Sequence, residues 1–248
     1  DEAVEVELVN YFIRGSISLT KVDKDYPDNK LTGAVFEVYS DTNGDGKLDK
    51  DDALLGTMTE MEGGIYQMKE LRYGKYLVRE KTAPTGYILD ENVYPVSIEE
   101  NGKTYTVENE AGKGFLNKAQ KGNLKIVKTS SDGKVEGFSF RITGVNYDQT
   151  FKTDRNGEIS IEGLRIGEYT VSEVNDKASA GYILPADKQA TVQMGATTIV
   201  QMHNELRDTP KTGDDFTPAL LVSLAAAFTI GAGVLGFLGI KGKKKKED

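Results

Sequence analysis

The sequence contains no cysteine. This absence excludes the disulfide bonds on which small exported domains usually depend. Either the hydrophobic cores of this protein are sufficient by themselves, or a covalent crosslink of another kind takes the place of the disulfide. The other residues of the sequence indicate which of these two alternatives applies.

Histidine is nearly absent as well, because His203 is the only one among 248 residues. A single histidine with no cysteine, no second histidine and no serine constellation around it indicates neither zinc binding nor catalysis. Glycine-rich phosphate-binding motifs are also missing. We therefore predict that the protein is not an enzyme acting on other molecules, and that it requires no cofactor.

Helical patterns are scarce in about the first two hundred residues. Short runs rich in Val, Ile, Tyr, Phe and Thr alternate there with Gly, Asn and Asp, which is typical of strands and tight turns. The net charge of −8 includes five lysines at the C-terminus, so the preceding part is more acidic still. The sequence predicts an all-β protein, and its acidity argues against a nucleic-acid partner.

The chain begins with an alternating segment, Asp1 to Asn10, and has neither an initiator methionine nor a signal peptide. An exported protein needs such a signal. We therefore expect the chain to be the C-terminal fragment of a longer protein. On this interpretation, residues 1–14 are the last strand of a truncated preceding repeat.

The longest uncharged segment lies near the C-terminus. Residues 216–240 are twenty-five residues without a charge, which is enough for a helix to cross a bilayer core. Five lysines follow within residues 241–248 and favour a cytoplasmic tail by the positive-inside rule. We predict a transmembrane helix over 216–240, with the preceding part of the chain outside the membrane.

The spacer before this helix, residues 207–215, contains a pentapeptide with Pro at its second position: Thr209, Pro210, Lys211, Thr212 and Gly213. Motif, span and basic tail together resemble the cell-wall sorting signal of Gram-positive surface proteins, Leu-Pro-x-Thr-Gly. The resemblance implies that the transpeptidase sortase cleaves between Thr212 and Gly213 and transfers the chain to peptidoglycan. Thr209 replaces the usual Leu, which leaves the sortase class open. The alternative is an ordinary single-pass membrane anchor.

The part of the chain before this motif contains an internal repeat. Residues 15–23 match residues 122–130, residues 64–80 match 157–173, and Gly-Tyr-Ile-Leu occurs at both 86–89 and 181–184. Each copy is long enough for a β-sandwich. We predict two tandem domains of the immunoglobulin-like or prealbumin-like type, at 15–121 and 122–206.

Strand alternation places three polar residues of each copy on otherwise apolar faces. They are Lys21, Glu80 and Asn117 in the first copy, and Lys128, Glu173 and Asn204 in the second. Burying an unpaired Lys or Glu is costly, so the two residues either pair or lose their charges. Burial lowers the pKa of Lys and raises that of Glu, which makes a neutral amine and a protonated acid attainable.

A neutral amine is a nucleophile. If the Asn carbonyl lies within reach, the amine can attack it while the acid polarises the carbonyl oxygen and relays protons. The product is a Lys–Asn isopeptide bond, with ammonia released. The alternative is a plain buried ion pair between Lys and Glu.

These positions resemble those of the Cna protein B-type domain, also called the SpaA-like or prealbumin-like domain, of Gram-positive adhesins and pilins. The motifs that carry the resemblance are Leu-Thr-Lys21-Val-Asp, Tyr76-Leu-Val-Arg-Glu80-Lys-Thr-Ala-Pro-Thr-Gly-Tyr, and Asn117 on the last strand. The resemblance covers nearly all of residues 15–206. The second copy departs from it by two inserted residues before Gly181 and by the absence of Ala-Pro.

The resemblance implies two spontaneous isopeptide bonds, each assisted by one acid. They are Lys21–Asn117 with Glu80, and Lys128–Asn204 with Glu173. By the same logic, Asn10 would be the acceptor for a lysine outside this chain, and we expect it to be unbonded here. This autocatalysis is the only reaction that we predict for the protein.

An acidic loop distinguishes the first copy from the second. Its residues at the ligand positions of an EF-hand-type calcium loop are Asp41, Asn43, Asp45, Lys47 (through its carbonyl), Asp49 and Asp52. Asp52 replaces the usual Glu, which predicts a weak Ca²⁺ site. A predicted strand from Ala34 to Tyr39 precedes the loop, so a true EF-hand is excluded. The alternative is a solvated hairpin loop with Asn-Gly and Asp-Gly turns.

We therefore expect a surface protein anchored in the cell wall of a Gram-positive bacterium, with a stalk of crosslinked domains that presents an adhesive N-terminal region. Its expected partners are sortase, peptidoglycan, the membrane transiently through residues 216–240, and a host or matrix ligand. Two alternatives stay open: a basal or accessory pilus subunit, and the stalk of a wall-bound enzyme. Val96 follows Tyr94-Pro95 where a shaft pilin would carry Lys, which disfavours a shaft role.

Overall fold

The computed structural model describes residues 7–208. The predicted sorting motif (209–213), membrane helix (216–240) and basic tail (241–248) lie outside the described residues. Within residues 7–208 there are strands and no α-helix, which confirms the all-β prediction for this part of the chain. Accordingly, no helix among the described residues has the length and hydrophobicity to cross a membrane.

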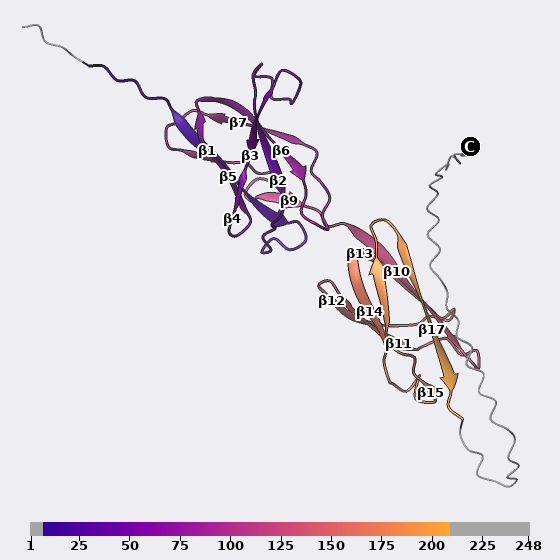
Figure 1. Cartoon of the computed structure of the whole chain (residues 1–248). Coiled ribbons are helices and arrows are strands. Elements are labelled where there is room, and N and C mark those ends of the chain that lie inside the picture. Colours follow the sequence, from indigo (N-terminus) through magenta and orange to yellow (C-terminus); the bar gives the residue numbers. More distant parts are fainter. Residues whose placement is uncertain (1–6, 209–248) are drawn as a thin grey trace, which may run out of the picture. The chain divides into compact units, whose positions relative to one another are not determined.

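The first copy of the repeat folds into two sheets (Figure 1). One sheet has the order β4 (Thr59–Met61), β5 (Ile65–Arg72), β1 (Arg14–Asp23) and β8 (Thr104–Thr106), and β9 (Phe115–Asn117) also pairs with β1. The other has the order β3 (Ala53–Thr57), β2 (Val35–Ser40), β6 (Gly74–Thr82) and β7 (Val93–Ile98). The acidic loop joins β2 to β3.

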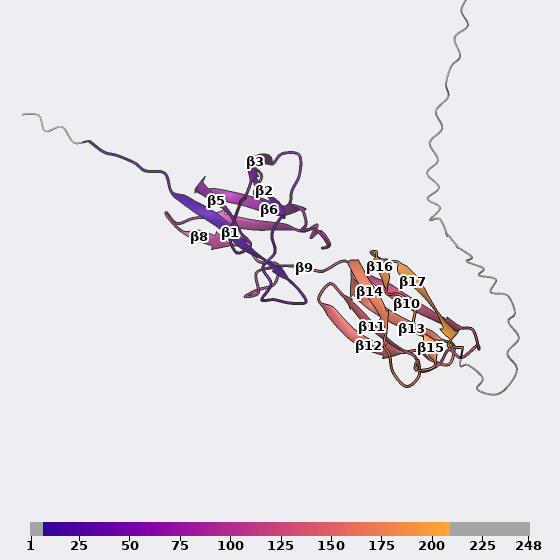
Figure 2. The same ribbon diagram turned by 60° about the horizontal axis from the view of Figure 1, so that its bottom comes forward.

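The second copy repeats this plan (Figure 2). One sheet has the order β13 (Glu158–Arg165), β10 (Lys121–Ser130), β17 (Thr197–Leu206) and β15 (Tyr182–Ile183). The other has the order β12 (Tyr147–Lys152), β11 (Ser139–Gly144), β14 (Gly167–Glu173) and β16 (Lys188–Val192). The described chain thus contains two tandem β-sandwiches, as predicted.

In each copy the first strand lies beside the last and runs parallel to it. Lys21 of β1 is in register with Phe115 of β9, and Lys128 of β10 is in register with Met202 of β17. Parallel strands need a long connection between them. Here the connection is the rest of the domain, so residues far apart in sequence become neighbours at this pair of strands.

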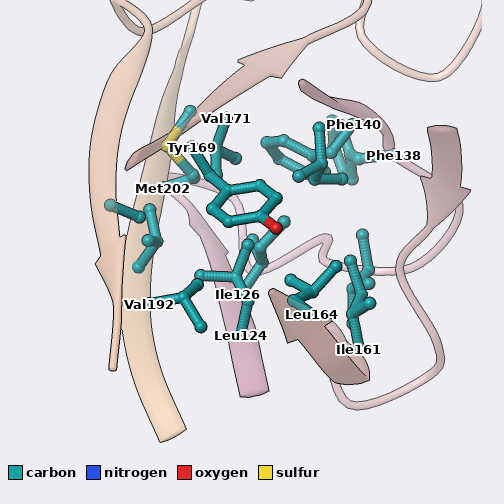
Figure 3. Packing of buried hydrophobic residues seen from close by; sticks show 14 of the residues in the cluster. Leu124, Ile126, Phe138, Phe140, Ile161, Leu164, Tyr169, Val171, Val192 and Met202 are labelled. Atoms are coloured by element: carbon teal, nitrogen blue, oxygen red, sulfur yellow. The ribbon is translucent and has the colours of Figure 1, made fainter. Parts of the chain in front are cut away.

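Each core closes around a tyrosine whose hydroxyl reaches the main chain. Figure 3 shows Tyr169 in the second copy, with Met202 on one side of its ring and Phe138 and Phe140 on the other. The Tyr169 hydroxyl donates to the carbonyl of Arg165 over 2.9 Å. The apolar ring is therefore buried without leaving its polar end unpaired.

The first copy uses the same arrangement. The Tyr76 hydroxyl donates to the carbonyl of Arg72 over 2.6 Å, at the matching position of the repeat. The ring of Phe36 lies 5.0 Å from that of Phe115 at a steep angle. Such edge-to-face pairs add about 0.5–1.5 kcal/mol to the stabilisation from buried area.

The predicted last strand of a preceding repeat, residues 1–14, is described only from residue 7 onward and stays a prediction, because its partner strands would belong to that repeat. Residues 7–13 form no strand, and β1 begins only at Arg14. The alternating pattern is not sufficient here, because a strand needs a neighbour for its backbone hydrogen bonds. No strand within residues 7–208 pairs with this segment, and Asn10 is exposed.

Candidate functional site

Three strands bring the predicted polar residues of the first copy together in its core. Lys21 lies on β1, Glu80 on β6 and Asn117 on β9, and their exposed fractions are 0%, 3% and 2%. Strand alternation explains this placement, because the inward neighbours Ile17 and Leu19 on β1 are also fully buried. The sequence pattern thus placed all three side chains on the inner faces.

The three side chains form a closed set of contacts. Lys21 Nζ lies 2.9 Å from Glu80 Oε1 and also donates to Asn117 Oδ1. Asn117 Nδ2 in turn lies 3.0 Å from both carboxylate oxygens of Glu80. The amine, the acid and the amide are therefore within hydrogen-bond distance of one another, the proximity that an amide exchange requires.

The surroundings of Lys21 favour its neutral form. Burial lowers the pKa of Lys21 to about 8, against the opposing effect of its hydrogen bond and charge interaction with Glu80. Nζ also lies 4.3 Å from the ring centre of Phe115 and 5.4 Å from that of Phe36. These rings exclude water from the amine and so also favour its neutral form.

Two main-chain groups that sequence reasoning missed complete this site. The carbonyl of Ile88 accepts from Asn117 Nδ2 over 3.1 Å, and the N–H of Asp90 donates to Glu80 Oε2 over 2.8 Å. Both belong to the loop after β6. The only sequence signal for this loop was the repeated Gly-Tyr-Ile-Leu, and that signal does not reveal the direction of backbone N–H and C=O groups.

A pocket of about 630 Å³ opens beside the first-copy site. Asn117 lines it together with Asp90, Asn109 and Leu116. The carboxylate of Asp90 accepts from the side chain of Asn109 over 2.9 Å, which fixes this wall of the pocket. The pocket offers a path for a small molecule such as ammonia to leave the amide of Asn117.

The second copy has the same strand positions but a different set of contacts. Asn204 Nδ2 donates to Glu173 Oε1 over 2.6 Å. Lys128 Nζ does not join them; it donates to the carbonyl of Thr129 over 2.6 Å and lies 4.4 Å from the ring centre of Phe138. The sequence predicted the three residues of this site, but the lysine is turned away from the other two.

Two buried polar atoms of the second site have no hydrogen-bond partner: Glu173 Oε2 and Asn204 Oδ1. Burial raises the pKa of Glu173 and lowers that of Lys128. Both shifts favour uncharged groups. In the first copy, the equivalent amide oxygen accepts from the amine, and both carboxylate oxygens of the acid have hydrogen-bond partners.

His203 behaves as expected for a surface residue of β17. Its side chain is about half exposed, at 51%, and its ring nitrogens contact Thr129 Oγ1 at 2.8 Å and Glu205 Oε1 at 3.0 Å. No other histidine exists in the sequence. The contacts are those of an ordinary exposed strand residue.

The acidic loop is ordered by its own backbone. Asp41 accepts from the N–H groups of Gly44 and Gly46, over 2.8 and 3.2 Å. Asp52 accepts from the N–H groups of Thr42 and Asp49, over 3.0 and 2.9 Å. Among residues 7–208, no three acidic or histidine side chains gather around one point where a metal ion could sit. Each carboxylate oxygen has two lone pairs, so these single hydrogen bonds leave acceptor capacity for a cation.

The described chain is thus a tandem pair of β-sandwiches, and each core holds a Lys, a Glu and an Asn on equivalent strands. A family model described as SpaA, prealbumin-like fold domain, matches the chain twice, over residues 15–113 and 122–206. The chain belongs to this family. The resemblance to SpaA-like domains drawn from the sequence motifs is confirmed.

Several solved structures are similar to this chain. The Bacillus anthracis TIE protein is 24% identical, with a TM-score of 0.60; the match covers 78% of this chain and 34% of that chain. This chain therefore spans about a third of the length of that protein. The C-terminal fragment of the pilus adhesin SpaC from Lactobacillus rhamnosus GG is 15% identical, with a TM-score of 0.47 and coverages of 80% and 99%. GBS52, the minor pilin of Streptococcus agalactiae, is 17% identical, with a TM-score of 0.36 and coverages of 81% and 100%. No curated protein matches the chain.

Proposed function

We propose that this chain is part of the stalk of a Gram-positive cell-surface protein, in which each domain crosslinks itself through a Lys–Asn isopeptide bond. The observation that carries the proposal is the contact of Lys21 with both Glu80 and Asn117 in a buried core site. Burying an amine, a carboxyl and an amide at one point lowers the stability of the fold, because all three lose their contacts with water. Such a cluster is therefore expected to react or to serve another specific purpose.

The three side chains of the site supply every atom and proton that this reaction needs. A proton first moves from Lys21 Nζ to the Glu80 carboxylate, so an ion pair becomes a neutral amine and an acid. Nζ then attacks Cγ of Asn117; the Nζ–Cγ bond forms and the Cγ–Nδ2 bond breaks. Glu80 polarises the amide and passes one proton from Nζ to the departing nitrogen. Ammonia leaves, and the carboxyl group of Glu80 keeps the remaining proton.

In the second copy, the same reaction requires one side-chain rotation. Lys128 Nζ must leave the carbonyl of Thr129 and move to Glu173 Oε2 and Asn204 Oδ1. An unpartnered buried polar atom costs about 1–3 kcal/mol. The rotation supplies a partner for both atoms, so the structure supports the second crosslink as well as the first.

The position of the bond suits a stalk. It joins the first strand of each domain to the last, so tension that enters at β1 and leaves after β9 passes through covalent bonds. The backbone hydrogen bonds between the strands then carry little of the load. The same logic applies to β10 and β17 in the second copy.

We further propose that residues 209–213 are the sortase motif of this stalk, followed by a membrane helix at 216–240. The order of motif, uncharged span and lysine-rich tail in the sequence supports this part of the proposal. Sortase would attach the carbonyl of Thr212 to peptidoglycan and so place the two domains at the cell surface.

Intact mass tests the crosslinks directly. We expect the folded chain to be lighter than its sequence by two ammonia molecules, one for each copy. Asn117→Ala should restore one of them, and Asn204→Ala the other. An unreduced mass for the folded wild-type chain would contradict the crosslinks, and peptide mapping would show which copy had failed to react.

Calcium binding by the acidic loop stays a separate prediction. Extracellular calcium is millimolar, which is enough to fill a weak site. We expect millimolar Ca²⁺ to raise the melting temperature of the first domain, and Asp45→Ala to remove the increase. The second domain has no such loop and is the internal control. An unchanged melting temperature at this concentration would favour the solvated hairpin loop.

A further inference from the structure

The two copies differ in one main-chain group beside the acid. In the first copy, the N–H of Asp90 donates to Glu80 Oε2 over 2.8 Å. Asp90 directly follows the Gly-Tyr-Ile-Leu sequence of that copy, and in the second copy the residue at this position is Pro185. Proline has no N–H to donate. In the second site, one carboxylate oxygen of the acid, Glu173 Oε2, is buried without a partner.

The strand register shows that the two positions are equivalent. Tyr87 is bridged to Ala119, and Tyr182 is paired with Leu206. Ala119 and Leu206 each lie two residues after the crosslinking asparagine of their own copy. The loops are therefore held against the last strand in the same register, and no insertion separates the tyrosine from the third residue after it.

A hydrogen bond to a carboxylate favours its charged form, and the loss of that bond favours the neutral acid. Lys21 and Glu80 accordingly form an ion pair in the first copy, with a contact of 2.9 Å. In the second copy, burial raises the pKa of Glu173, and Lys128 is not in contact with it.

Other charged groups around the two acids do not account for this difference. Glu80 faces Lys21 of β1 and, at longer range, Tyr66 of β5; the charge of Asp90 acts on Lys21. Glu173 faces Lys128 of β10 and Asp176 of the following loop. Each site thus has one lysine and one nearby aspartate. The N–H at position 90, absent at position 185, is a contact that only one acid receives.

We propose that the residue after Gly-Tyr-Ile-Leu is a positioning residue that sets the form of the unreacted Lys–Glu pair: Asp90 holds the first pair charged, and Pro185 leaves the second pair neutral. The proposal rests on the isopeptide reaction proposed above. That reaction needs a neutral amine and a protonated acid, so it requires a pair that holds one proton in total. The rate therefore falls at low pH, where both groups are protonated, and at high pH, where neither is.

Substitutions at this position should change the low-pH side of the rate profile. Pro185→Ala supplies an N–H to Glu173, which stabilises the carboxylate. We expect the second crosslink to form about tenfold more slowly at neutral pH. The decrease in its rate at low pH should begin about one pH unit lower than in the wild-type chain. Asp90→Pro removes the N–H from Glu80, and the first crosslink should change in the opposite direction by a similar factor.

Asp90→Ala is the matched control for Asp90→Pro. Both variants lose the carboxylate, which accepts from Tyr94, Asn92 and Asn109, but only the proline variant also loses the N–H. Because the Asp90 charge raises the pKa of Lys21, Asp90→Ala should move the high-pH side of the profile and leave the low-pH side in place. The unmodified copy in each variant is an internal control.

The experiment uses the 248-residue chain, recovered unfolded from inclusion bodies after its uncrosslinked mass has been verified. The chain is refolded at a series of pH values, folding is followed by circular dichroism, and acid-quenched samples are analysed by peptide mass spectrometry for each crosslink. The expected result is that the low-pH side of the rate profile shifts in Pro185→Ala and in Asp90→Pro. It should not shift in Asp90→Ala. Crosslinks that form with unchanged low-pH profiles would overturn this inference and leave the proposed function intact. If no crosslink forms in any folded chain, both are wrong.

Discussion

Replacing Glu80 with glutamine is expected to leave the first domain without its crosslink, while the second domain keeps its own. Glutamine preserves the shape of the side chain but can neither accept the proton of Lys21 nor pass one to the leaving nitrogen. The bond would close a loop between residues 96 positions apart. By analogy with disulfides of similar span, its loss costs about 4–5 kcal/mol of stability. For a domain of this size, we expect the melting temperature to fall by about 20 °C or more.

Peptide mass spectrometry and thermal unfolding of the same sample test this prediction. Glu173→Gln is the matched control, because it should remove only the second crosslink. Glu80→Ala should give the same chemical result as Glu80→Gln, with an additional loss of stability from an unpaired buried Lys21. A Lys21–Asn117 bond that still forms in Glu80→Gln would show that the acid is not required.

The rate of the first crosslink should fall as the pH rises above about 8. Burial lowers the pKa of Lys21 to about 8. Below this value the Lys21–Glu80 pair holds one proton, which can move to the carboxylate and produce the reactive neutral pair. Above it the pair loses this proton, and the neutral amine then has no acid beside it. We expect the rate to decrease about tenfold for each further pH unit.

This dependence is measured by refolding the uncrosslinked chain between pH 6 and 10. Steps of about one pH unit bracket the lowered pKa of Lys21. The amount of crosslinked peptide is followed with time at each pH. Asn117→Ala, which cannot react, shows whether the domain still folds over the whole range. A rate that continues to rise above pH 8 would mean that only the neutral amine matters, and that the acid has no part in the proton transfer.

Strand alternation and the internal repeat together were sufficient to find the six residues of the two candidate sites. A strand has two faces, so Lys21 had to lie on the face of Ile17 and Leu19 once these two residues were buried. The internal repeat then selected the same positions in the second copy. For this reason, the sandwich fold and the site residues could be predicted without knowledge of any contact.

Alternation could not predict whether the side chains of one site touch. Lys21 contacts its partners, but Lys128 donates to the carbonyl of Thr129, although both lysines occupy the same position on their strands. A long side chain has several rotamers on a given face. The choice among them depends on groups contributed by other segments, which the pattern of one strand does not contain.

The sequence by itself determined the all-β fold, the two copies and which side chains face each core, because these properties follow from local periodicity. Only the tertiary structure decided that the first site is a closed set of contacts while the second has two unpartnered oxygens. It also decided that the N–H of Asp90 points at Glu80 and that the carboxylates of the acidic loop accept from their own backbone. These features depend on backbone direction and on contacts between segments far apart in the chain, and local periodicity specifies neither.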